Sequence, residues 1–520
     1  VSRWPKHWRR ASGYNLDRLA AALMPAEERG KLSFDSRFRP PACDPTRIDR
    51  FNLAQLITGS EGTLATITEA TLRLVAKPKM TAVSVIHFER TLDACAAITD
   101  ILECEPSASE LLDKQVMDLA RAQPQWAKKM GFVEGDPEAV LLTEFYGESE
   151  KELVQKMDRL ESHLRARGWK GVIRRSLDKK GQSDIWEVRK AGLNLLTSMR
   201  GDYKGIPGIE DVAVPAESLA DYIGKLLQWC DGREAMLGMG VYAHASAGCL
   251  HTRPMINVKM ADFAVNLCLQ YGGVMSGEHG DGYARSALNP QLFGPTLYEA
   301  LRQVKQVFDP QGMMNPGKIV DAPPLTENLR MGSSYQTIEL QTIFDWSEDN
   351  GFAGAIEMCN GAGVCRKVGA GTMCPSYMAT KDEKDTTRAR ANGLRNALAG
   401  KWGEGGYPLG GVKGEMLYSE EMYDILDLCL GCKACKSECP SSVDMAKIKA
   451  EVLPHYYQRH GLPLFNRLMG WLPVIYEIGD RLGDWEVSEQ LKNRAVSLAN
   501  HLLTSSWFKP IQAKIGVHPA

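Results

Sequence analysis

A run of four cysteines late in the chain limits its fold and chemistry more than any other feature. Cys429, Cys432, Cys435 and Cys439 follow the spacing Cys-x2-Cys-x2-Cys-x3-Cys, and Pro440 comes directly after. Two intervening residues let a tight loop aim the first three thiolates at one point, whereas the last thiolate, held by proline, points away. The spacing therefore predicts a loop folded around an inorganic centre.

Two kinds of centre use closely spaced cysteines. A structural zinc site also binds Cys-x2-Cys pairs. Three evenly spaced cysteines followed by Cys-Pro are instead typical of a 4Fe–4S cluster. We therefore predict an iron–sulfur cluster here, with zinc as the alternative.

An earlier cysteine group resembles the same run with two changes. It consists of Cys359, Cys365 and Cys374-Pro375, with Ala362 at the second cysteine position and extra residues before Cys374. If the two groups exchange their last cysteines, Cys374 completes the cluster of the first three cysteines of the later run. Cys359, Cys365 and Cys439 would then form a second site that lacks one thiolate. The alternative is that Cys359 and Cys365 pack as small apolar residues, so one or two clusters are both possible.

Composition excludes several classes of protein. The chain has 520 residues, a formal net charge of −2, 44% hydrophobic and 24% charged residues, which is ordinary globular usage. No basic block indicates a nucleic-acid partner, and no apolar run approaches the ~20 residues of a transmembrane helix. Thirteen cysteines, an odd number spread over a long chain, argue against a secreted disulfide scaffold.

Strand and helix patterns alternate through the first half of the chain. They predict an α+β layer in which helices cover one face of a sheet. The predicted strands are Thr63–Leu74, Thr81–Phe88, Val140–Tyr146, Gly171–Ser176 and Val212–Val214. The predicted helices are Leu92–Leu102, Ser149–Arg167, Ile185–Ser198, Ala216–Cys230 and Lys259–Tyr271.

Three histidines and a glutamate form a second candidate site. Seven positions separate His244 from His251, and a turn of small residues at Ser246–Gly248 would fold this segment into a hairpin that brings both rings together. Glu278 and His279 follow between glycines. Two histidines and a carboxylate suit a divalent metal with an open position, which leaves His279 as a base. The alternative is a set of hydrogen-bonded histidines in a glycine-rich loop.

Five motifs, including the two histidine segments, occur in an order that makes the chain recognisable. They are Ser12-Gly-Tyr-Asn-Leu16, Gly59-Ser-Glu-Gly-Thr-Leu64, His244-x6-His251, Gly277-Glu-His-Gly280 and Asn315-Pro-Gly-Lys-Ile319. Together they resemble the FAD-linked oxidases of the vanillyl-alcohol-oxidase type, in the branch of D-lactate and D-2-hydroxyglutarate dehydrogenases. With the cysteine groups, the chain looks like the large bacterial dehydrogenases that fuse such a flavin unit to an iron–sulfur unit.

This resemblance implies an α+β fold and an order of domains. It implies the C-terminal part of a FAD-binding domain, a substrate domain with a mixed or antiparallel sheet, a linker, a mainly helical ferredoxin-like iron–sulfur domain and a helical tail. The expected bounds are 1–78, 79–320, 321–350, 351–465 and 466–520. The family's FAD domain begins well before its Ser-Gly-Tyr-Asn motif, so we expect this chain to be an internal fragment.

The resemblance also implies roles for particular residues. The metal ligands would be His244, His251 and Glu278, and zinc is the expected ion. The base would be His279. Arg189 and Lys204 would contact substrate carboxylates, although Leu193 stands where the family often has a hydroxyl residue. The residues expected at the flavin are Gly59, Ser60, Glu61, Gly62, Thr63 and Asn315.

The implied reaction is the FAD-dependent oxidation of a D-2-hydroxy acid, such as D-2-hydroxyglutarate or D-lactate, to the 2-oxo acid. One or two 4Fe–4S clusters would pass the electrons to a quinone, a cytochrome or an electron-transfer flavoprotein. The alternatives are a glycolate-oxidase-like or glycerol-phosphate-like dehydrogenase and a non-catalytic electron-transfer subunit. The expected location is the cytoplasm, with peripheral attachment to the inner membrane left open.

Overall fold

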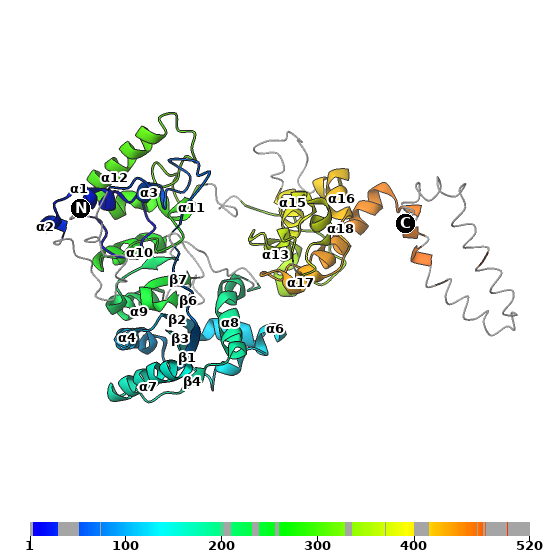
Figure 1. Cartoon of the computed structure of the whole chain (residues 1–520). Helices are drawn as coiled ribbons and strands as arrows, with labels where there is room; N and C mark the ends of the chain where they lie inside the picture. Colours follow the sequence, from blue (N-terminus) through cyan, green and yellow to red (C-terminus); the bar gives the residue numbers. More distant parts are fainter. Residues whose placement is uncertain are drawn as a thin grey trace. The chain divides into compact units, whose positions relative to one another are not determined.

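The computed structural model divides the chain into two compact units (Figure 1). The first comprises Val1–Tyr335 with Glu348–Asn350, and the second comprises Gln336–Ser347 with Gly351–Ala520. The structure describes residues 4–29, 51–72, 74–197, 199–200, 210–230, 239–254, 259–327, 335–369, 371–399 and 415–464, with a few positions between 466 and 497. Lys204 and most of the expected helical tail lie outside these residues.

A seven-stranded sheet forms the centre of the first unit. Its strand order is β4-β1-β3-β2-β6-β7-β5, and each neighbouring pair is antiparallel. The strands are β1 (Met80–Phe88), β2 (Ala108–Asp113), β3 (Ala139–Gly147), β4 (Ile173–Ser176), β5 (Val212–Ala213), β6 (Met239–His244) and β7 (Cys249–Pro254). The predicted α+β class with an antiparallel sheet is confirmed.

Helices cover both faces of this sheet, so the expectation of one covered face is wrong. Ile86 and Leu141 pack under α4 (Thr91–Leu102), α7 (Glu150–Ala166), α9 (Leu219–Cys230) and α10 (Lys259–Gln270). Val85 and Leu142 point the other way, toward α5 (Lys114–Arg121) and α8 (Lys179–Thr197). In Figure 1, α4 and α9 lie on one side of the strands and α8 on the other. The near-continuous apolar runs of β1 and β3 reflect this two-sided burial.

A small third layer in the first unit packs Trp4, Tyr14, Leu56 and Leu64 against Phe293. Its helices are α1 (Leu16–Leu23), α2 (Ala26–Arg29), α3 (Ala54–Ile57), α11 (Gly282–Arg285) and α12 (Asn289–Phe308), while α6 (Pro124–Ala127) lies beside α5. Gly294 adopts a φ of 69° and kinks α12.

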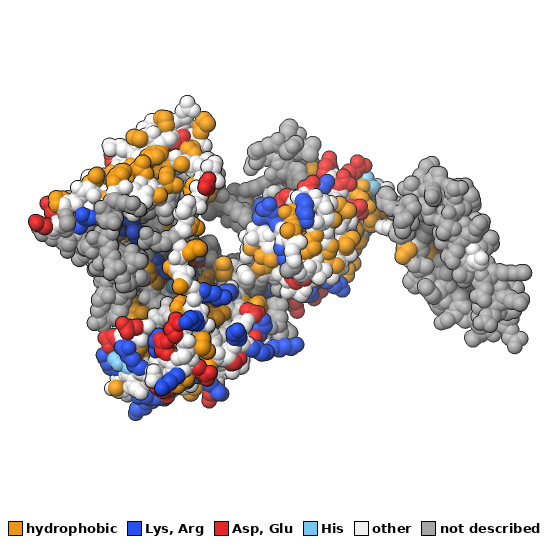
Figure 2. Space-filling model, in the orientation of Figure 1, with side chains coloured by type: hydrophobic (Ala, Val, Ile, Leu, Met, Phe, Trp, Pro, Cys, Tyr) orange, Lys and Arg blue, Asp and Glu red, His pale blue; other side chains and the backbone are white. Residues whose placement is uncertain are grey.

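The predicted strand Thr63–Leu74 is wrong, because its described residues make no ladder with a neighbouring strand. Leu74 is 87% exposed and the nearby Val75 is 92% exposed. Hydrophobic side chains also gather over α12 (Figure 2), where Val307 is 77% exposed. Exposed apolar surfaces of this kind are typical of regions that contact another polypeptide.

The second unit is mainly helical, as predicted. Its helices are α13 (Gly351–Glu357), α14 (Pro375–Thr380), α15 (Thr387–Ala399), α16 (Glu420–Asp427), α17 (Ala434–Glu438) and α18 (Met445–His460). The buried Glu451 carboxylate of α18 accepts hydrogen bonds from the backbone N–H groups of Ile343 at 2.7 Å and Phe344 at 2.9 Å. This carboxylate therefore fastens the segment before α13 to α18. Among the described residues of either unit, no helix has the length and apolar character to cross a bilayer.

Candidate functional sites

The β6–β7 hairpin brings two of the predicted histidines together. His244 ends β6, His251 lies in β7, and the short turn Ala245–Ala247 joins the two strands. Gly248 completes the turn with a φ of 62°, and a Cβ atom there would lie 1.8 Å from the carbonyl oxygen of Val214. Only glycine fits this close approach, so the small-residue turn predicted from the sequence is confirmed.

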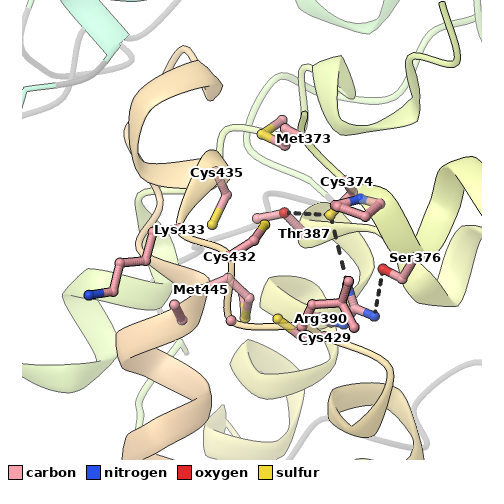
Figure 3. A pocket seen from close by; sticks show the side chains of 14 residues that line it. Met373, Cys374, Ser376, Thr387, Arg390, Cys429, Cys432, Lys433, Cys435 and Met445 are labelled. Carbon is pink, nitrogen blue, oxygen red and sulfur yellow. Dashed lines mark hydrogen bonds between the residues drawn. The ribbon is translucent and has the colours of Figure 1, made fainter. Parts of the chain in front are cut away.

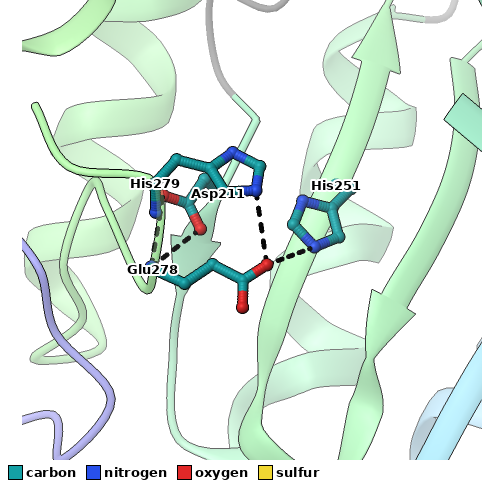
Figure 4. A group of neighbouring side chains, drawn as sticks. All are labelled: Asp211, His251, Glu278 and His279. Atoms are coloured by element: carbon teal, nitrogen blue, oxygen red, sulfur yellow. Dashed lines mark hydrogen bonds and ion pairs between the residues drawn. The ribbon is translucent and has the colours of Figure 1, made fainter. Parts of the chain in front are cut away.

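One carboxylate oxygen, Glu278 Oε1, gathers all three histidines. The Nε2 atoms of His244, His251 and His279 lie 3.1, 3.3 and 3.3 Å from it. Figure 4 shows Glu278 between His251 and His279, with the loop of Glu278 facing β7. Two atoms bonded to one metal at about 2.1 Å in tetrahedral geometry lie about 3.4 Å apart. Each separation from Glu278 Oε1 fits such a pair, but the ligand atoms that all lie within 4.8 Å of one another belong to Asp211, His251, Glu278 and His279, a group without the predicted ligand His244.

Asp211, which was not predicted from the sequence, contacts the loop that carries Glu278 and His279. Its ligand oxygen lies within 4.8 Å of ligand atoms of His251, Glu278 and His279. The same carboxylate accepts hydrogen bonds from the backbone N–H groups of Glu278 at 3.0 Å and His279 at 2.8 Å, and from Ser276 Oγ at 2.6 Å. Because these donors engage both carboxylate oxygens, Asp211 fixes the loop that carries Glu278 and His279.

Two other acids contact the histidines from outside the predicted set. Glu210 Oε1 lies 3.4 Å from His279 Nδ1. Glu110 Oε1 lies 2.8 Å from His244 Nδ1. Each contact leaves the Nε2 atom of its ring directed at Glu278. The short strand β2, which carries Glu110, was not predicted, because Ser109–Leu112 has two polar residues followed by two apolar ones and so lacks the alternation of a half-buried strand.

The charges of the cluster shift the pKa values of its members. Hydrogen bonds from His244, His251 and His279 lower the pKa of Glu278 well below its usual value. Glu210 and Glu278 raise the pKa of His279 to about 10. Burial by itself lowers the pKa of His244, but Glu110 and Glu278 raise it to about 8. Burial lowers the pKa of His251. The raised pKa values of His244 and His279 reflect the negative charge of Glu110, Glu210 and Glu278, which a divalent cation would also compensate.

Arg189 lies near the histidines but pairs with a protein carboxylate. Its Nε and Nη2 atoms donate to Glu110 Oε2 at 3.0 and 2.7 Å, and its guanidinium lies 4.9 Å from the ring centre of Tyr242. Glu110 thus joins Arg189 to His244. An unpredicted arginine, Arg9, forms an ion pair with Glu278 Oε2. Leu193 is partly exposed one turn after Arg189 on α8.

The turn predicted to face the flavin is fastened to the histidine loop. The Glu61 carboxylate accepts hydrogen bonds from the backbone N–H groups of Asp281 at 2.6 Å and Gly282 at 3.0 Å. Asn315 Nδ2 donates to the Glu61 carbonyl oxygen at 2.7 Å. The structure therefore brings the Gly59–Thr63 turn, Asn315 and the residues after His279 into one region.

The conformation of this turn fits a flat ligand. Gly59 and Gly62 have φ angles of 79° and 69°, and nothing lies within 4 Å of where a Cβ atom would stand on either. Ser60 and Thr63 are buried, and Thr63 Oγ1 donates to the Ser60 carbonyl oxygen at 2.6 Å. A ring system could thus approach the open glycine backbone while the two hydroxyl residues hold the turn.

Four cysteines of the second unit line a single pocket that is open to solvent, and about 310 Å³ of space free of protein atoms lies in the pocket and its mouth. They are Cys374, Cys429, Cys432 and Cys435, and Figure 3 shows them around one opening. Among the described residues, no three of these sulfurs lie within 4.8 Å of one another. Sulfurs bonded to a single zinc at about 2.3 Å lie about 3.8 Å apart. The wider arrangement fits a multi-iron cluster better than one zinc ion.

The remaining cysteines of the two groups lie outside this pocket. Cys359 and Cys365 are buried, and Cys439 is partly buried. Burial, with a contribution from Cys359, raises the pKa of Cys439. Burial, with contributions from Cys429 and Cys374, raises the pKa of Cys435. These neighbours agree with the predicted exchange of the last cysteines, but the second cluster and the ligand sets stay predictions.

The protein families matched by the chain agree with this arrangement. Residues 77–319 match the family described as FAD linked oxidases, C-terminal domain. Residues 355–443 match the 4Fe-4S dicluster domain. One segment of the chain is therefore similar to a FAD-linked oxidase C-terminal domain, and a later segment is similar to a 4Fe–4S domain. These two matches support FAD and an iron–sulfur cluster as cofactors.

Relatives of known name extend the likeness beyond either domain. The chain is 31% identical to D-2-hydroxyglutarate dehydrogenase of Pantoea ananatis over 470 residues, which cover 81% of this chain and 45% of that protein. It is 27% identical to D-lactate dehydrogenase of Archaeoglobus fulgidus over 286 residues, which cover 52% of this chain and 58% of that protein. The chain spans about half the length of these relatives.

Among solved structures, the chain resembles p-cresol methylhydroxylase with substrate bound. It has a TM-score of 0.35 and 13% sequence identity, and it covers 47% of this chain and 53% of that chain. This score is too low to support an argument about the fold. The α+β assignment instead follows from the antiparallel sheet and the family matches.

Proposed function

We propose that this chain supplies the substrate and electron-transfer parts of a flavin-dependent dehydrogenase that oxidises a D-2-hydroxy acid to the 2-oxo acid. The observation that carries the proposal is the convergence of three imidazole Nε2 atoms on Glu278 Oε1, in a loop fastened to the Gly59–Thr63 turn. The names of the relatives, D-2-hydroxyglutarate dehydrogenase and D-lactate dehydrogenase, support the class of substrate.

In this proposal His244, His251 and Glu278 hold a divalent metal, with zinc as the proposed ion. When bound, the metal supplies Lewis acidity toward the substrate hydroxyl and FAD supplies the acceptor for a hydride. The neutral form of His279 accepts the hydroxyl proton at Nε2, and a cation at Glu278 would favour that form by lowering the pKa of about 10 that Glu210 and Glu278 give this ring. Arg9 and Asp211 keep the Glu278 loop in position.

Arg189 and Lys204 are the proposed contacts for substrate carboxylates. The two hydrogen bonds from Arg189 to Glu110 Oε2 must then loosen or be shared when substrate binds. Gly59, Ser60, Glu61, Gly62, Thr63 and Asn315 are the proposed flavin contacts. The backbone of the two open glycines allows the close approach that a ring requires.

Cys374, Cys429, Cys432 and Cys435 are the proposed ligands of a 4Fe–4S cluster. Such a cluster accepts one electron at a time, so it divides the two electrons of the substrate into single steps. The proposed final acceptor is therefore a quinone, a cytochrome or an electron-transfer flavoprotein. Cys359, Cys365 and Cys439 are proposed to hold a second cluster with a ligand other than cysteine.

A substrate panel tests the proposal on protein that has FAD bound. Anaerobic mixing with D-2-hydroxyglutarate, D-lactate, their L-enantiomers, glycolate and glycerol 3-phosphate would be followed by bleaching of the flavin absorbance. We expect bleaching by at least one D-2-hydroxy acid and none by its L-enantiomer. Reduction by glycerol 3-phosphate alone, or by no member of the panel, would contradict the proposal. The His279→Asn variant provides the matched control.

A further inference from the structure

The Cys374 thiol receives two side-chain hydrogen bonds from a single helix. Thr387 Oγ1, at the first position of α15, lies 3.2 Å from Cys374 Sγ, and Arg390 Nη1 lies 3.8 Å from the same sulfur. Figure 3 shows both contacts at the wall of the four-cysteine pocket. Thr387 is 2% exposed and Arg390 is fully buried. Because a ligating thiolate carries no proton, the hydroxyl of Thr387 is the donor in that state.

The surrounding contacts fix the direction of the Arg390 guanidinium. Arg390 Nε donates to the carbonyl oxygen of Ile425 at 2.8 Å, and Nη2 donates to Ser376 Oγ at 3.2 Å. Nη1 also donates to the carbonyl oxygen of Asp385 at 2.6 Å. The Asp385 carboxylate lies 3.7 Å from Nη2 and compensates part of the positive charge. The guanidinium therefore cannot turn away from the sulfur without leaving several buried groups unpaired.

The other described thiols of the pocket have different surroundings. The backbone N–H groups of Met445 and Ala446 contact Cys435. Near Cys429, Lys449 Nζ donates to the backbone carbonyl oxygen, at 2.8 Å, rather than to the sulfur. Among the described residues, the side-chain hydrogen bonds to a sulfur of this pocket thus fall on Cys374, which is the proposed ligand from the earlier cysteine group.

Hydrogen bonds to a cysteine ligand affect the reduction potential of an iron–sulfur cluster. The reduced cluster carries one more negative charge than the oxidised cluster, so a donor to the ligand sulfur stabilises the reduced form more. A nearby buried cation acts in the same direction. The two donors should therefore raise the potential of whatever cluster Cys374 ligates.

We propose that Thr387 and Arg390 are positioning residues that raise the midpoint potential of the cluster held by Cys374, Cys429, Cys432 and Cys435. The inference rests on the proposed electron-transfer function. The step concerned is the gain of one electron from the reduced flavin and its later loss to a one-electron carrier, with no bond made or broken. A higher potential favours transfer of the electron out of the flavin.

The Thr387→Val variant tests this proposal, and Thr387→Ser is its matched control. Valine keeps the shape of threonine and removes the donor, whereas serine keeps the hydroxyl. An EPR-monitored redox titration would give the midpoint potential of each protein, and iron analysis would give its cluster content. We expect Thr387→Val to lower the reduced-to-oxidised ratio at a fixed solution potential by roughly three- to tenfold. For one electron, tenfold corresponds to about 59 mV.

A second variant and a second spectroscopic measurement keep the test valid if the Thr387→Val protein fails to fold. Arg390→Lys keeps the positive charge but loses the planar guanidinium. It should lower the midpoint potential less than the double variant Thr387→Val/Arg390→Lys does. The Fe–S(Cys) stretch in resonance Raman spectra should rise in frequency when the donor to Cys374 is removed. An unchanged midpoint in Thr387→Val with full iron content would overturn the inference while leaving the cluster intact. A wild-type protein without iron would overturn the proposed cluster, and this inference with it.

Discussion

The histidine cluster of the first unit and the cysteine pocket of the second differ in the contacts that their candidate ligand atoms make. In the first, His244, His251 and His279 all contact Glu278. In the second, four thiols face a pocket with about 310 Å³ of free space. The side chains of the first site form hydrogen bonds and ion pairs with one another, whereas the sulfurs of the second line a pocket.

This difference indicates how much each site depends on an added group. The charges of the histidine cluster are balanced by protein side chains, among them Arg9, Glu110 and Glu210. The cysteine pocket holds two buried thiols, Cys374 and Cys435, and a bound cluster would supply the bonds that hold them to the rest of the pocket. We therefore expect the second unit to lose more stability than the first when its inorganic group is removed.

The largest expected effect follows from removal of one cluster ligand. Cys432→Ser should remove the part of the broad visible iron–sulfur absorbance that comes from the cluster of Cys374, Cys429, Cys432 and Cys435, and should destabilise the second unit by on the order of 5 kcal/mol, because ligation contributes to folding. Absorbance, iron content and urea denaturation would measure this. Cys104→Ser, in the first unit and outside both cysteine groups, is the control that should keep the absorbance. Zinc in place of iron in the wild-type protein would refute the prediction.

The next effect separates metal binding from proton transfer in the histidine cluster. His251→Ala should remove both the metal and the activity, since His251 is a proposed ligand. His279→Asn should keep the metal and lower the rate by about 10²–10⁴-fold, because general base catalysis contributes that much. Metal analysis and flavin-reduction rates would distinguish the two variants. If chelators leave the activity unchanged while His279 stays essential, the metal has no role in the reaction.

The same comparison explains what the sequence could predict. Cys429, Cys432 and Cys435 lie close together in the chain, so their spacing alone predicted that they would line one site. The β6–β7 hairpin was also local, because Gly248 and its small neighbours define the turn. Helices such as α7 and α9 followed from their apolar periodicity.

The partners of the histidines depend on contacts that spacing does not reveal. Glu110 reaches His244 because β2 pairs with β6, with Leu111 opposite Ala243. Glu210 and Asp211 come from a segment more than sixty residues before Glu278, as the separations of 67 and 68 residues from Asp211 to Glu278 and His279 show. The Thr63–Leu74 strand failed for the related reason that an alternating pattern does not supply a neighbouring strand.

A third experiment tests whether Glu110 stabilises the first site through buried charge. Glu110→Gln would leave Arg189 without its ion pair, and both side chains are about nine-tenths buried. Breaking a buried pair in this way typically costs about 3–5 kcal/mol. Urea denaturation, followed by a spectroscopic signal from the first unit, would measure the loss in its free energy of unfolding. Asp136→Asn, in the exposed pair with Lys114, should change stability much less. Equal losses in the two variants would show that burial of the Glu110 pair has no special weight.

The smallest expected effect concerns two buried acids, one in each unit, whose pKa values shift in opposite directions. Burial raises the pKa of Asp113 to about 7, although the N–H groups of Val116 and Val241 donate to it. Burial also acts to raise the pKa of Glu451, but the N–H groups of Ile343, Trp346 and Phe344 lower it below its usual value. The charged form is thus disfavoured in the first unit and favoured in the second.

These opposite shifts predict opposite pH dependences of stability. Asp113 binds its proton more tightly when folded, so its contribution is complete below about pH 4 and is lost as the pH rises through about 7. Glu451 contributes above about pH 4.3, the usual value for a glutamate, and its contribution is lost as the pH falls through its lowered pKa. Denaturation of wild type, Asp113→Asn and Glu451→Gln from pH 3 to pH 8 would compare these contributions. The stability difference between wild type and Asp113→Asn should shrink by on the order of 2 kcal/mol as the pH rises, whereas that for Glu451→Gln should grow. Parallel profiles for the two variants would mean that the hydrogen bonds to Glu451 do not outweigh its burial.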